Sequence, residues 1–261
     1  MLRVLTLNIW NLDGDWRARR QGILAVLRQW EPDLVCLQEV VETEKGNQAE
    51  WLAAQLGGWA VAFGSVPHDL GPARFGNAVL SRWPIDAVTS TELPHEADEQ
   101  EVQRVVVHAR TNGVDVFSTH LAWQLHDAAL RERQAQALVA FVDEQTDAKA
   151  VVGPIIAGDL NAEPDSTAIR YLTGLTSLAG KSTYFQDAWR LAGQGGGGLT
   201  WSRANANAAI EHEPDRRIDY IFSGVHLDTG AGRPLECHVV ADEPVDGVWP
   251  SDHFGVFAVL A

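Results

Sequence analysis

The apolar run from Val151 to Ala157, with the polar residues that follow it, constrains the fold of this chain more than any other stretch. Such a run is typical of a buried strand, and it leads into Gly158-Asp159-Leu160-Asn161. Asp159 and Asn161 are two residues apart, so their side chains lie on the same side of an extended chain. A carboxylate can accept a proton and an amide can donate to a negative charge, which suits chemistry better than structure. The alternative is that both side chains only cap a turn.

Similar polar residues occur at several other predicted strands. Each lies at the end of an apolar run, within it or just before it, where an apolar residue would be expected. Each case alone has a structural explanation: a turn for Asn8, an ion pair with an arginine for Glu39, and a hydrogen-bonded core position for His120. So many polar strand ends are hard to explain separately, and together they indicate one shared site. The residues concerned are Asn8, Glu39, His120, Asp159, Asn161, Asp219, Asp252 and His253.

Helical and strand patterns are mixed along the chain, without an internal repeat or an interdomain linker. Apolar residues at helical spacing predict helices over 16–30 and 126–144, and Asn112-Gly113 predicts a tight hairpin turn between two strands. Hairpins are too many for a doubly wound parallel sheet. We therefore expect an α/β (α+β) protein in which two sheets pack face to face with helices outside, forming a single domain over residues 1–261.

Composition limits the classes of partner. The formal net charge is −15, so the chain is not a natural nonspecific binder of nucleic acid unless arginines gather locally. No apolar run approaches the roughly 20 residues that span a membrane, so we expect no stable membrane association. The N-terminus does not read as a signal peptide, which predicts a cytoplasmic protein if Met1 is the natural start. We expect a monomer.

The acidic strand ends offer a metal site and a charged pair. Glu39, helped by Asn8 and Asp252, provides hard oxygen ligands, which suit Mg²⁺ or Mn²⁺ and not Zn²⁺. His253 directly follows an acid and can form an Asp–His pair with Asp219.

The remaining strand-end residues supply donors and a base. His120 and Asn161 can donate to phosphate oxygens, and Asp159 can activate water. A metal ion, donors to an oxyanion and a water-activating acid are the parts needed for attack of water on phosphorus.

On these residues the sequence resembles the endonuclease/exonuclease/phosphatase superfamily, a group that includes deoxyribonucleases, apurinic endonucleases and neutral sphingomyelinases. The resemblance covers nearly the whole chain, and its motifs stand in the family's order. It implies a four-layer α/β/β/α sandwich of two packed, mostly antiparallel sheets. The matching segments are LTLNIW (5–10), LVCLQEV (34–40), GNAVLSRWP (76–84), FSTHL (117–121), IIAGDLNAEPDS (155–166), RRIDYIF (216–222) and PSDHFGV (250–256).

The resemblance also implies roles for the metal-binding residues and the base. Glu39 would be the principal Mg²⁺ ligand, with Asn8 beside it and Asp252 nearby. Asp159 would orient or deprotonate the attacking water.

The other roles concern the phosphoryl group. By resemblance, Asn161 and His120 hold its oxygens, and His253, oriented by Asp219, contacts the phosphate. Whether the general base is Asp159 or the Asp219–His253 pair stays open. Apurinic endonucleases have Tyr in place of His120, which disfavours that branch.

The resemblance does not fix the substrate. Bacterial sphingomyelinases are secreted and this chain shows no signal, while inositol polyphosphate phosphatases need a basic cluster that a chain with so few lysines does not supply. Thr200-Trp201 is similar to a Thr-Trp motif of tyrosyl-DNA phosphodiesterases, but Ser202 replaces the acid that follows it there. That similarity therefore carries little weight.

Four of the ten tryptophans lie in or beside the presumed active-site loops. Ordinary core or loop packing is one explanation. The other is an aromatic rim that stacks on a base, a sugar or an apolar group next to the phosphate. These tryptophans are Trp10, Trp123, Trp201 and Trp249.

These observations predict a Mg²⁺-dependent phosphoester hydrolase. The preferred interpretation is a phosphodiesterase that acts by metal-assisted in-line attack of water on phosphorus. The alternative is a DNA/RNA endo- or exonuclease, for which the substrate is a nucleotide or nucleic acid. A catalytically inactive binding module is a remote third hypothesis, because every position that matches a catalytic motif holds a usable residue.

Overall fold

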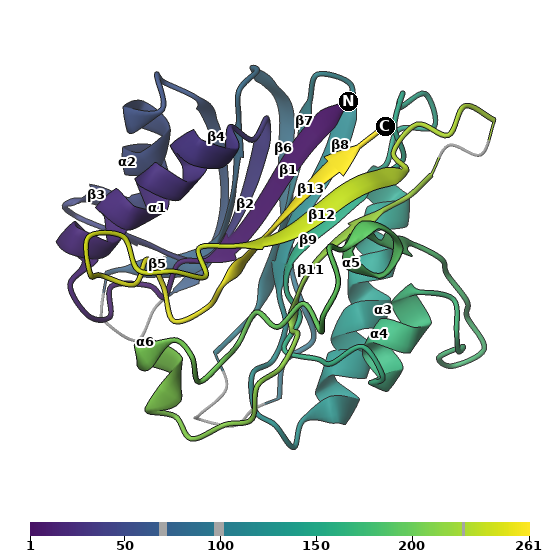
Figure 1. The fold of residues 1–261 in the computed structure, drawn as a ribbon. Helices are drawn as coiled ribbons and strands as arrows, with labels where there is room; N and C mark the ends of the chain where they lie inside the picture. Colours follow the sequence, from purple (N-terminus) through teal and green to yellow (C-terminus); the bar gives the residue numbers. More distant parts are fainter. Residues whose placement is uncertain (68–71, 97–101, 226–227) are drawn as a thin grey trace.

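Two β-sheets packed face to face form the centre of the molecule (Figure 1). The structure is a computed structural model that describes residues 1–67, 72–96, 102–225 and 228–261. The first sheet has the order β12 (Pro234–Val240), β13 (Gly255–Leu260), β1 (Leu2–Asn8), β2 (Leu34–Thr43), β5 (Arg74–Ser81) and β4 (Ala60–Pro67), with β3 (Gly46–Asn47) against β2. The second has the order β10 (Gln186–Asp187), β11 (Asp219–Ser223), β9 (Ile155–Asp159), β8 (Val114–His120), β7 (Val105–Thr111) and β6 (Ile85–Glu92).

The pairing of the strands is mostly antiparallel, as predicted. Among the described strands, β1 with β2 and β8 with β9 are the parallel pairs. The turn between β7 and β8 is the predicted hairpin, in which Asn112 and Gly113 both have positive φ, at 49° and 74°. Asn and Gly are the residues that reach this conformation at least cost, so the tight turn follows from the sequence.

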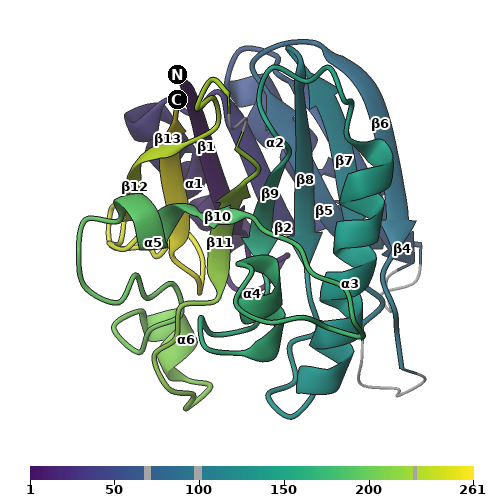
Figure 2. The ribbon, with the colours of Figure 1, turned by 90° about the vertical axis from the view of Figure 1, so that its right-hand side faces the viewer.

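Helices cover both outer faces of the sheet pair (Figure 2). The first sheet carries α1 (Trp16–Trp30) and α2 (Gln48–Gln55), and the second carries α3 (Ala128–Gln145) and α4 (Thr167–Leu172). Two shorter helices, α5 (Ala188–Ala192) and α6 (Ala206–Ala209), lie in the segment that leads to β11. The predicted four-layer α/β/β/α sandwich is therefore confirmed.

Three apolar clusters hold the four layers together. Val4, Val107 and Ile155 belong to the cluster between the sheets. The outer faces of the two sheets bury separate clusters beneath the helices on either side. Alternate residues of each strand point to opposite faces, so one strand contributes to two of these layers, and this explains the nearly continuous apolar runs.

One strand differs from its prediction. The strand expected over 151–157 is β9, which begins at Ile155 and continues through Asp159. Pro154 has no amide hydrogen to donate to a ladder, so it stands outside the strand despite its apolar neighbours. The shift carries Asp159 into the last strand position, where its backbone is fixed by both neighbouring strands.

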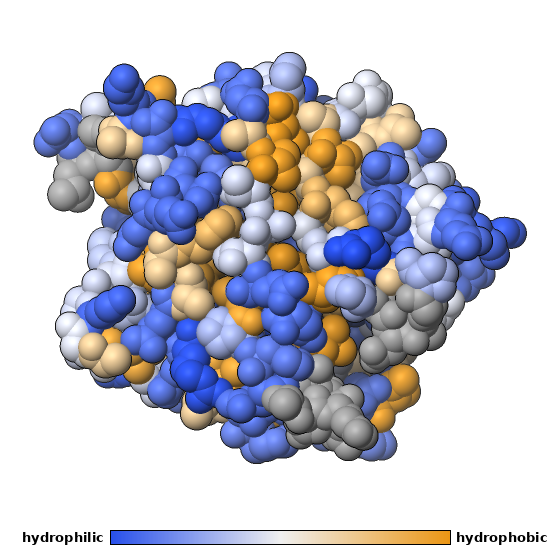
Figure 3. Space-filling view, turned by 180° about the vertical axis from the view of Figure 1, so that it is seen from behind, coloured by the Kyte–Doolittle hydropathy of each residue, from blue (hydrophilic) through white to orange (hydrophobic). Residues whose placement is uncertain are grey.

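The surface is unevenly polar. The face opposite that of Figure 1 is hydrophilic around its margins and carries a group of apolar residues near its upper centre (Figure 3). The edge strand β6 is mostly exposed and rich in polar residues, which discourages pairing with another chain. Across the described ranges, no helix has both the length and the apolar character needed to cross a membrane.

Candidate active site

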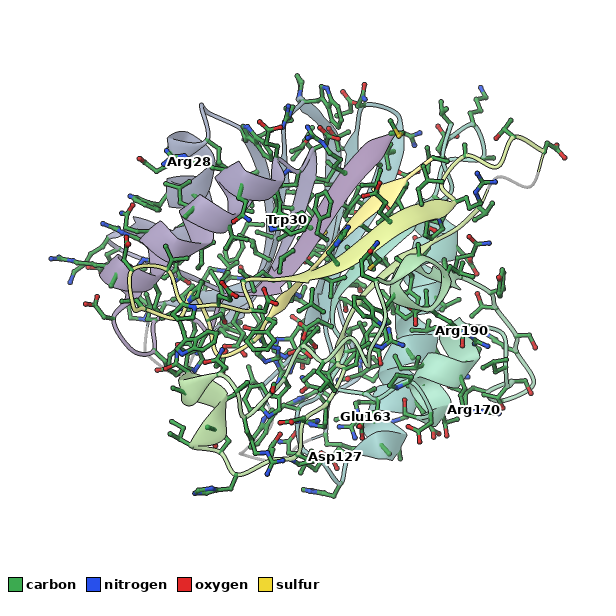
Figure 4. All side chains as sticks on the ribbon, viewed as in Figure 1. Arg28, Trp30, Asp127, Glu163, Arg170 and Arg190 are labelled. Carbon is green, nitrogen blue, oxygen red and sulfur yellow. The ribbon has the colours of Figure 1, made fainter. Side chains whose placement is uncertain are left out.

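Several strand ends converge at one edge of the sheet pair. The register places His120 of β8 beside Asp159 of β9, and Asp159 beside Asp219 of β11. Glu163, shortly after β9, marks this edge at the bottom of the molecule in Figure 4. A cavity of about 220 Å³ opens there. It is lined by Glu39, His120, Trp123, Asp159, Asn161, Trp201, Glu211, Glu213, Arg216, Ile218, Asp252 and His253.

Glu39 reaches the cavity because β2 is bulged. The register of β2 on β5 shifts between Leu37 and Val40, and Glu39 has a φ of 57°. A bulge re-aims a side chain, and a non-glycine residue in this conformation is strained in a way that is common at functional sites. The half-buried carboxylate accepts hydrogen bonds from the amides of Asn8 (3.1 Å) and Asn11 (3.0 Å).

Asn8 is buried and links the residues that the two sheets contribute to the cavity. Its amide nitrogen donates to Glu39 Oε1 at 3.1 Å and to Asp159 Oδ2 at 3.1 Å. Its carbonyl oxygen accepts from the backbone amide of Trp10 at 2.9 Å. Asn8 therefore fixes the predicted metal ligand on the first sheet relative to the predicted base on the second.

The two carboxylate oxygens of Asp159 have different surroundings. Oδ1 accepts from the backbone amide of Asn161 at 2.9 Å, which closes a turn and gives Asn161 a φ of 48°. Oδ2 faces the cavity, 3.3 Å from His120 Nε2 and 3.6 Å from His253 Nε2. The turn-capping and chemical interpretations of Asp159 therefore apply to different oxygens. Burial, with the nearby Asp219 adding to it, raises the pKa of Asp159 to about 7.

His253 and Asp219 form a buried pair. His253 Nδ1 lies 2.9 Å from Asp219 Oδ2, while the other oxygen of Asp219 is buried without a hydrogen-bond partner in the described residues. Burial alone would lower the pKa of His253. The charges of Asp219 and Asp159 outweigh it and raise that pKa well above its usual range. His253 is therefore an imidazolium at neutral pH, with Nε2–H directed toward the cavity.

His120 is held in the opposite charge state. Burial, with Arg104 adding to it, lowers the pKa of His120 well below its usual range, so the ring is neutral. Arg104 Nη1 lies 3.1 Å from His120 Nδ1. The same Arg104 atom lies 3.2 Å from His120 Nε2, which also lies 3.0 Å from the amide nitrogen of Asn161 and 3.3 Å from Asp159 Oδ2. His120 and Asn161 are thus neutral polar groups beside the charged His253.

The donor chemistry of the cavity fits a hard divalent cation. Glu39 and Asp252 contribute carboxylates to the same cavity, and burial, opposed by His253 and reinforced by Glu39, raises the pKa of Asp252 to about 7. Two carboxylates forced together are what a bound cation relieves. Oxygen ligands of this kind suit Mg²⁺ or Mn²⁺.

A second group of possible ligand atoms comes from Asp159, Asp219 and His253. Their atoms lie within 4.8 Å of one another. The 2.9 Å hydrogen bond between His253 and Asp219 already uses Nδ1 and one carboxylate oxygen, which leaves fewer ligand atoms for a metal in this group. We therefore regard this group as an acid–base cluster and Glu39 with Asp252 as the better metal ligands.

The four tryptophans divide into two groups. Trp123, which is 46% exposed, and Trp201 line the cavity, and Trp201 packs edge-on against His253 with ring centroids 4.9 Å apart. Trp10 instead packs under Arg19, and Trp249 stacks on Phe254. Neither is among the described residues that line the cavity. The structure thus leaves Trp123 and Trp201 as the candidates for an aromatic rim.

Arg19 is a residue of the site that the sequence did not reveal. It is 2% exposed, and its guanidinium donates to the backbone carbonyls of Ile9, Trp10, Asn11, Asp13 and Pro250. These carbonyls belong to the loop after Asn8 and the turn before Asp252. Burial lowers the pKa of Arg19 to about 10, against the opposing charge of Asp252, so the side chain stays charged at neutral pH. One arginine therefore fixes both the loop after Asn8 and the turn before the predicted metal ligand Asp252.

Replacing Arg19 with methionine is expected to lower the free energy of unfolding by about 3 kcal/mol or more, since several buried carbonyls lose a charged donor. The metal concentration needed for half-maximal activity should rise, because the loops of Asn8 and Asp252 lose their common anchor. Arg17→Met, on the exposed side of the same helical turn, should change the unfolding free energy by less than about 0.5 kcal/mol. Equal losses in the two variants, measured by urea unfolding, would show that Arg19 has no special role.

Two further buried residues fix the backbone around Asp219 and His253. Thr200 Oγ1 accepts from the backbone amide of Asp219 at 3.1 Å, and the Thr200 carbonyl accepts from Phe254 at 2.7 Å. The amide of Asn205 donates to the carbonyls of Ser251 and Asp252 at 2.9 and 3.0 Å. Small polar residues in an irregular segment are the one sequence signal that would have pointed to them.

Comparison with known proteins identifies the family of the chain. The family model described as "Endonuclease/Exonuclease/phosphatase family" matches residues 5–253. Tyrosyl-DNA phosphodiesterase 2 of Gallus gallus is 24% identical over 257 residues, which cover 95% of this chain and 64% of that protein, so the chain spans less than two-thirds of this relative's length.

Two solved structures have a similar fold. D. rerio TDP2 complexed with a single-strand DNA product has a TM-score of 0.76 at 20% identity and covers 100% of this chain and 98% of its own. An endonuclease/exonuclease/phosphatase from Beutenbergia cavernae has a TM-score of 0.67 at 26% identity and covers 99% of this chain and 71% of its own. Since the family model spans nearly all of the sequence, the chain belongs to the endonuclease/exonuclease/phosphatase family.

Proposed function

We propose that this protein is a phosphodiesterase that depends on a divalent metal ion, with Mg²⁺ or Mn²⁺ as that ion. The observation that carries the proposal is one cavity in which the carboxylates of Glu39 and Asp252 face His120, Asp159 and His253. Relatives named as phosphodiesterases, and one bound to a single-strand DNA product, support the reaction class.

The protein residues divide the chemistry by charge. Asp159 Oδ2 is the acceptor that orients or deprotonates the attacking water, because its pKa of about 7 suits a base near neutral pH. His253, kept protonated by Asp219, donates from Nε2 to the phosphoryl group or the leaving oxygen. His120 and the amide of Asn161 hold the non-bridging oxygens. This division favours Asp159 over the His253–Asp219 pair as the base.

The metal completes the charge balance of the site. Glu39 and Asp252 would hold it, and Asn8 fixes the Glu39 carboxylate. When bound, a Mg²⁺ or Mn²⁺ ion supplies Lewis-acid stabilisation of the charge that develops on phosphate oxygens.

The cavity favours a small substrate. About 220 Å³ accommodates a phosphoryl group with one modest substituent, and two further carboxylates, Glu211 and Glu213, line it. With a net charge of −15, long-range attraction to a polyanion is weak. We therefore propose a phosphodiester with an aromatic or nucleoside substituent as the preferred substrate. The single domain, monomeric state and cytoplasmic location stay predictions.

A nuclease is the second candidate, and one feature favours it. A larger cavity of about 1110 Å³ lies along α1 and α2 and contains Arg17, Arg20 and Lys45. The guanidinium of Arg20 lies over the ring of Trp51 at 4.1 Å. Basic and aromatic side chains together are the composition of a single-strand binding groove, although the same cavity also contains acidic residues.

A substrate panel tests the proposal. Purified protein with Mg²⁺ is expected to hydrolyse bis-p-nitrophenyl phosphate faster than p-nitrophenyl phosphate, and to cleave plasmid DNA slowly at physiological salt. Faster turnover of the monoester would contradict a phosphodiesterase. Efficient plasmid cleavage would instead promote the nuclease candidate.

Replacing Trp123 with alanine is expected to raise the KM for an aromatic diester about tenfold, which corresponds to one lost stacking contact of about 1–3 kcal/mol. Trp123 is suited to this role because it is 46% exposed and lines the cavity. Tyr184→Ala, which removes an even more exposed aromatic ring elsewhere (61% exposed), should leave KM unchanged. If KM is unchanged in both variants, Trp123 is an ordinary surface residue.

A further inference from the structure

Arg216 occupies an unusual position in the wall of the catalytic cavity. Its backbone forms an antiparallel bridge with Trp201, through hydrogen bonds of 2.8 and 3.0 Å. Residues paired in this way direct their side chains to the same face. Trp201 packs edge-on against His253, so the bridge brings Arg216 to the same side of the cavity as the proposed proton donor.

A second cavity of about 200 Å³ adjoins the catalytic one. Asn161 and Arg216 are the described residues that line both cavities. Since Asn161 is a proposed donor to the phosphoryl oxygens, Arg216 stands beside the place where the phosphate would bind. The side chain of Arg216 is only 7% exposed, so its guanidinium is almost fully removed from solvent.

The hydrogen bonds of this guanidinium are incomplete. Its Nη2 donates to Glu213 Oε2, whereas its Nε is buried and has no hydrogen-bond partner in the part of the chain that the structure describes. A buried donor without a partner is costly, because the hydrogen bond to water has been lost. Glu213 itself also lines the catalytic cavity and is 19% exposed. The structure therefore contains an arginine with an unused donor, Nε, held by a carboxylate that solvent can reach.

We propose that Arg216 is a substrate-binding residue whose guanidinium exchanges Glu213 for the phosphate group of the substrate. This inference rests on the proposed phosphodiesterase function and extends it. A planar guanidinium matches two oxygens of a phosphate, and the phosphate would satisfy the donor that Glu213 leaves unused. Glu213 is then a competitor of the substrate, which turns outward to solvent when the phosphate binds.

The competition predicts opposite effects for the two partners. Arg216→Gln should raise the inhibition constant of inorganic phosphate, and the KM of bis-p-nitrophenyl phosphate, by about 10–100-fold, the range expected for a lost hydrogen bond to a charged group. Glu213→Gln should lower the inhibition constant of inorganic phosphate by about threefold or more, because Arg216 loses a charged partner but keeps its own charge. A purely structural ion pair predicts losses in both variants.

A neighbouring ion pair offers a matched control. Arg203 pairs with Asp215 at 3.4 Å in the same segment, but its side chain is 63% exposed. Arg203→Gln should leave phosphate inhibition within about twofold of the unmodified protein. Arg216→Lys keeps the charge but loses the planar fork, and should fall between Arg216→Gln and the unmodified protein.

Calorimetric binding of inorganic phosphate in the presence of Mg²⁺, measured alongside inhibition, separates this inference from the proposed function. Opposite shifts for Arg216→Gln and Glu213→Gln support the exchange, even if the protein hydrolyses none of the diesters tested. Shifts in the same direction, or an Arg216→Gln variant that behaves like Arg203→Gln, overturn it, while metal-dependent hydrolysis by the unmodified protein keeps the proposed function. If Arg216→Gln does not fold, the sign of the Glu213→Gln effect decides.

Discussion

Replacing His253 with alanine is expected to lower kcat by at least about a hundredfold, the lower range for a positioned acid–base group. The reason is the charge state of the ring. Asp219 and Asp159 raise the pKa of His253 well above its usual range, so alanine removes a proton donor directed into the cavity. Asp219→Asn should also reduce kcat, because the amide cannot stabilise the imidazolium at 2.9 Å. Asp159→Asn should lower kcat by at least about a hundredfold, because it removes the proposed base.

The chain offers a matched control for these variants in a second buried Asp–His pair. His108 Nε2 lies 2.8 Å from Asp115 Oδ1, in the interior of the second sheet and away from the catalytic cavity. His108→Ala should lower the melting temperature while leaving kcat nearly unchanged. His253→Ala should instead lower kcat while leaving the melting temperature nearly unchanged. If His253→Ala unfolds the protein, or if both variants lose activity in proportion to stability, the polar strand ends are structural and the assigned roles are wrong.

The residues that sequence reasoning located share one property. Asn8, His120 and Asp159 end apolar strands, where a polar side chain stands out against its neighbours. Glu39 stood out for the same reason, but its bulge could not be predicted, because a bulge depends on the register with the partner strand β5.

The residues that were missed or misplaced depend on contacts made after folding. Arg19 looks like one of several polar residues on α1, and only the arrangement of the loops around it explains its burial. Trp10 follows Asn8 closely, but its φ of 54° and its contact with Arg19 turn it away from the cavity. The spacing in the sequence predicted that Trp10 lies near the site, but it could not predict where the side chain of Trp10 points.

The Thr200-Trp201 pair is a case in which the sequence similarity was given too little weight. Ser202 interrupts the motif, and this substitution gave the similarity to tyrosyl-DNA phosphodiesterases little weight. A curated relative of that kind nevertheless aligns with almost the whole chain. Thr200 also has a structural reason to be present, since its hydroxyl fixes the start of the strand that carries Asp219. The change at Ser202 was therefore weaker evidence against the similarity than the hydrogen bonds of Thr200 were for it.

Removal of the divalent metal is expected to abolish hydrolysis, and Mg²⁺ or Mn²⁺ should restore it. Glu39→Gln should raise the metal concentration needed for half-maximal activity at least about a hundredfold, beyond the 10–100-fold range typical of residues that only support a ligand. The amide keeps the shape of the side chain but loses the charge that Asn8 and Asn11 hold in place. Glu42→Gln, three residues along β2 with its carboxylate bonded to Asn47, should leave the metal requirement unchanged.

The same titrations distinguish the two groups of possible metal ligands. If the ion were held by Asp159, Asp219 and His253, Asp219→Asn would raise the metal requirement more than Glu39→Gln. We expect the reverse, with Asp219→Asn lowering kcat at saturating metal and leaving the requirement nearly unchanged. We expect an effect on kcat and not on the metal requirement because Asp219 is hydrogen-bonded to His253, the proposed proton donor. Full activity in excess chelator would remove the metal from the mechanism altogether and leave Glu39 and Asp252 without a role.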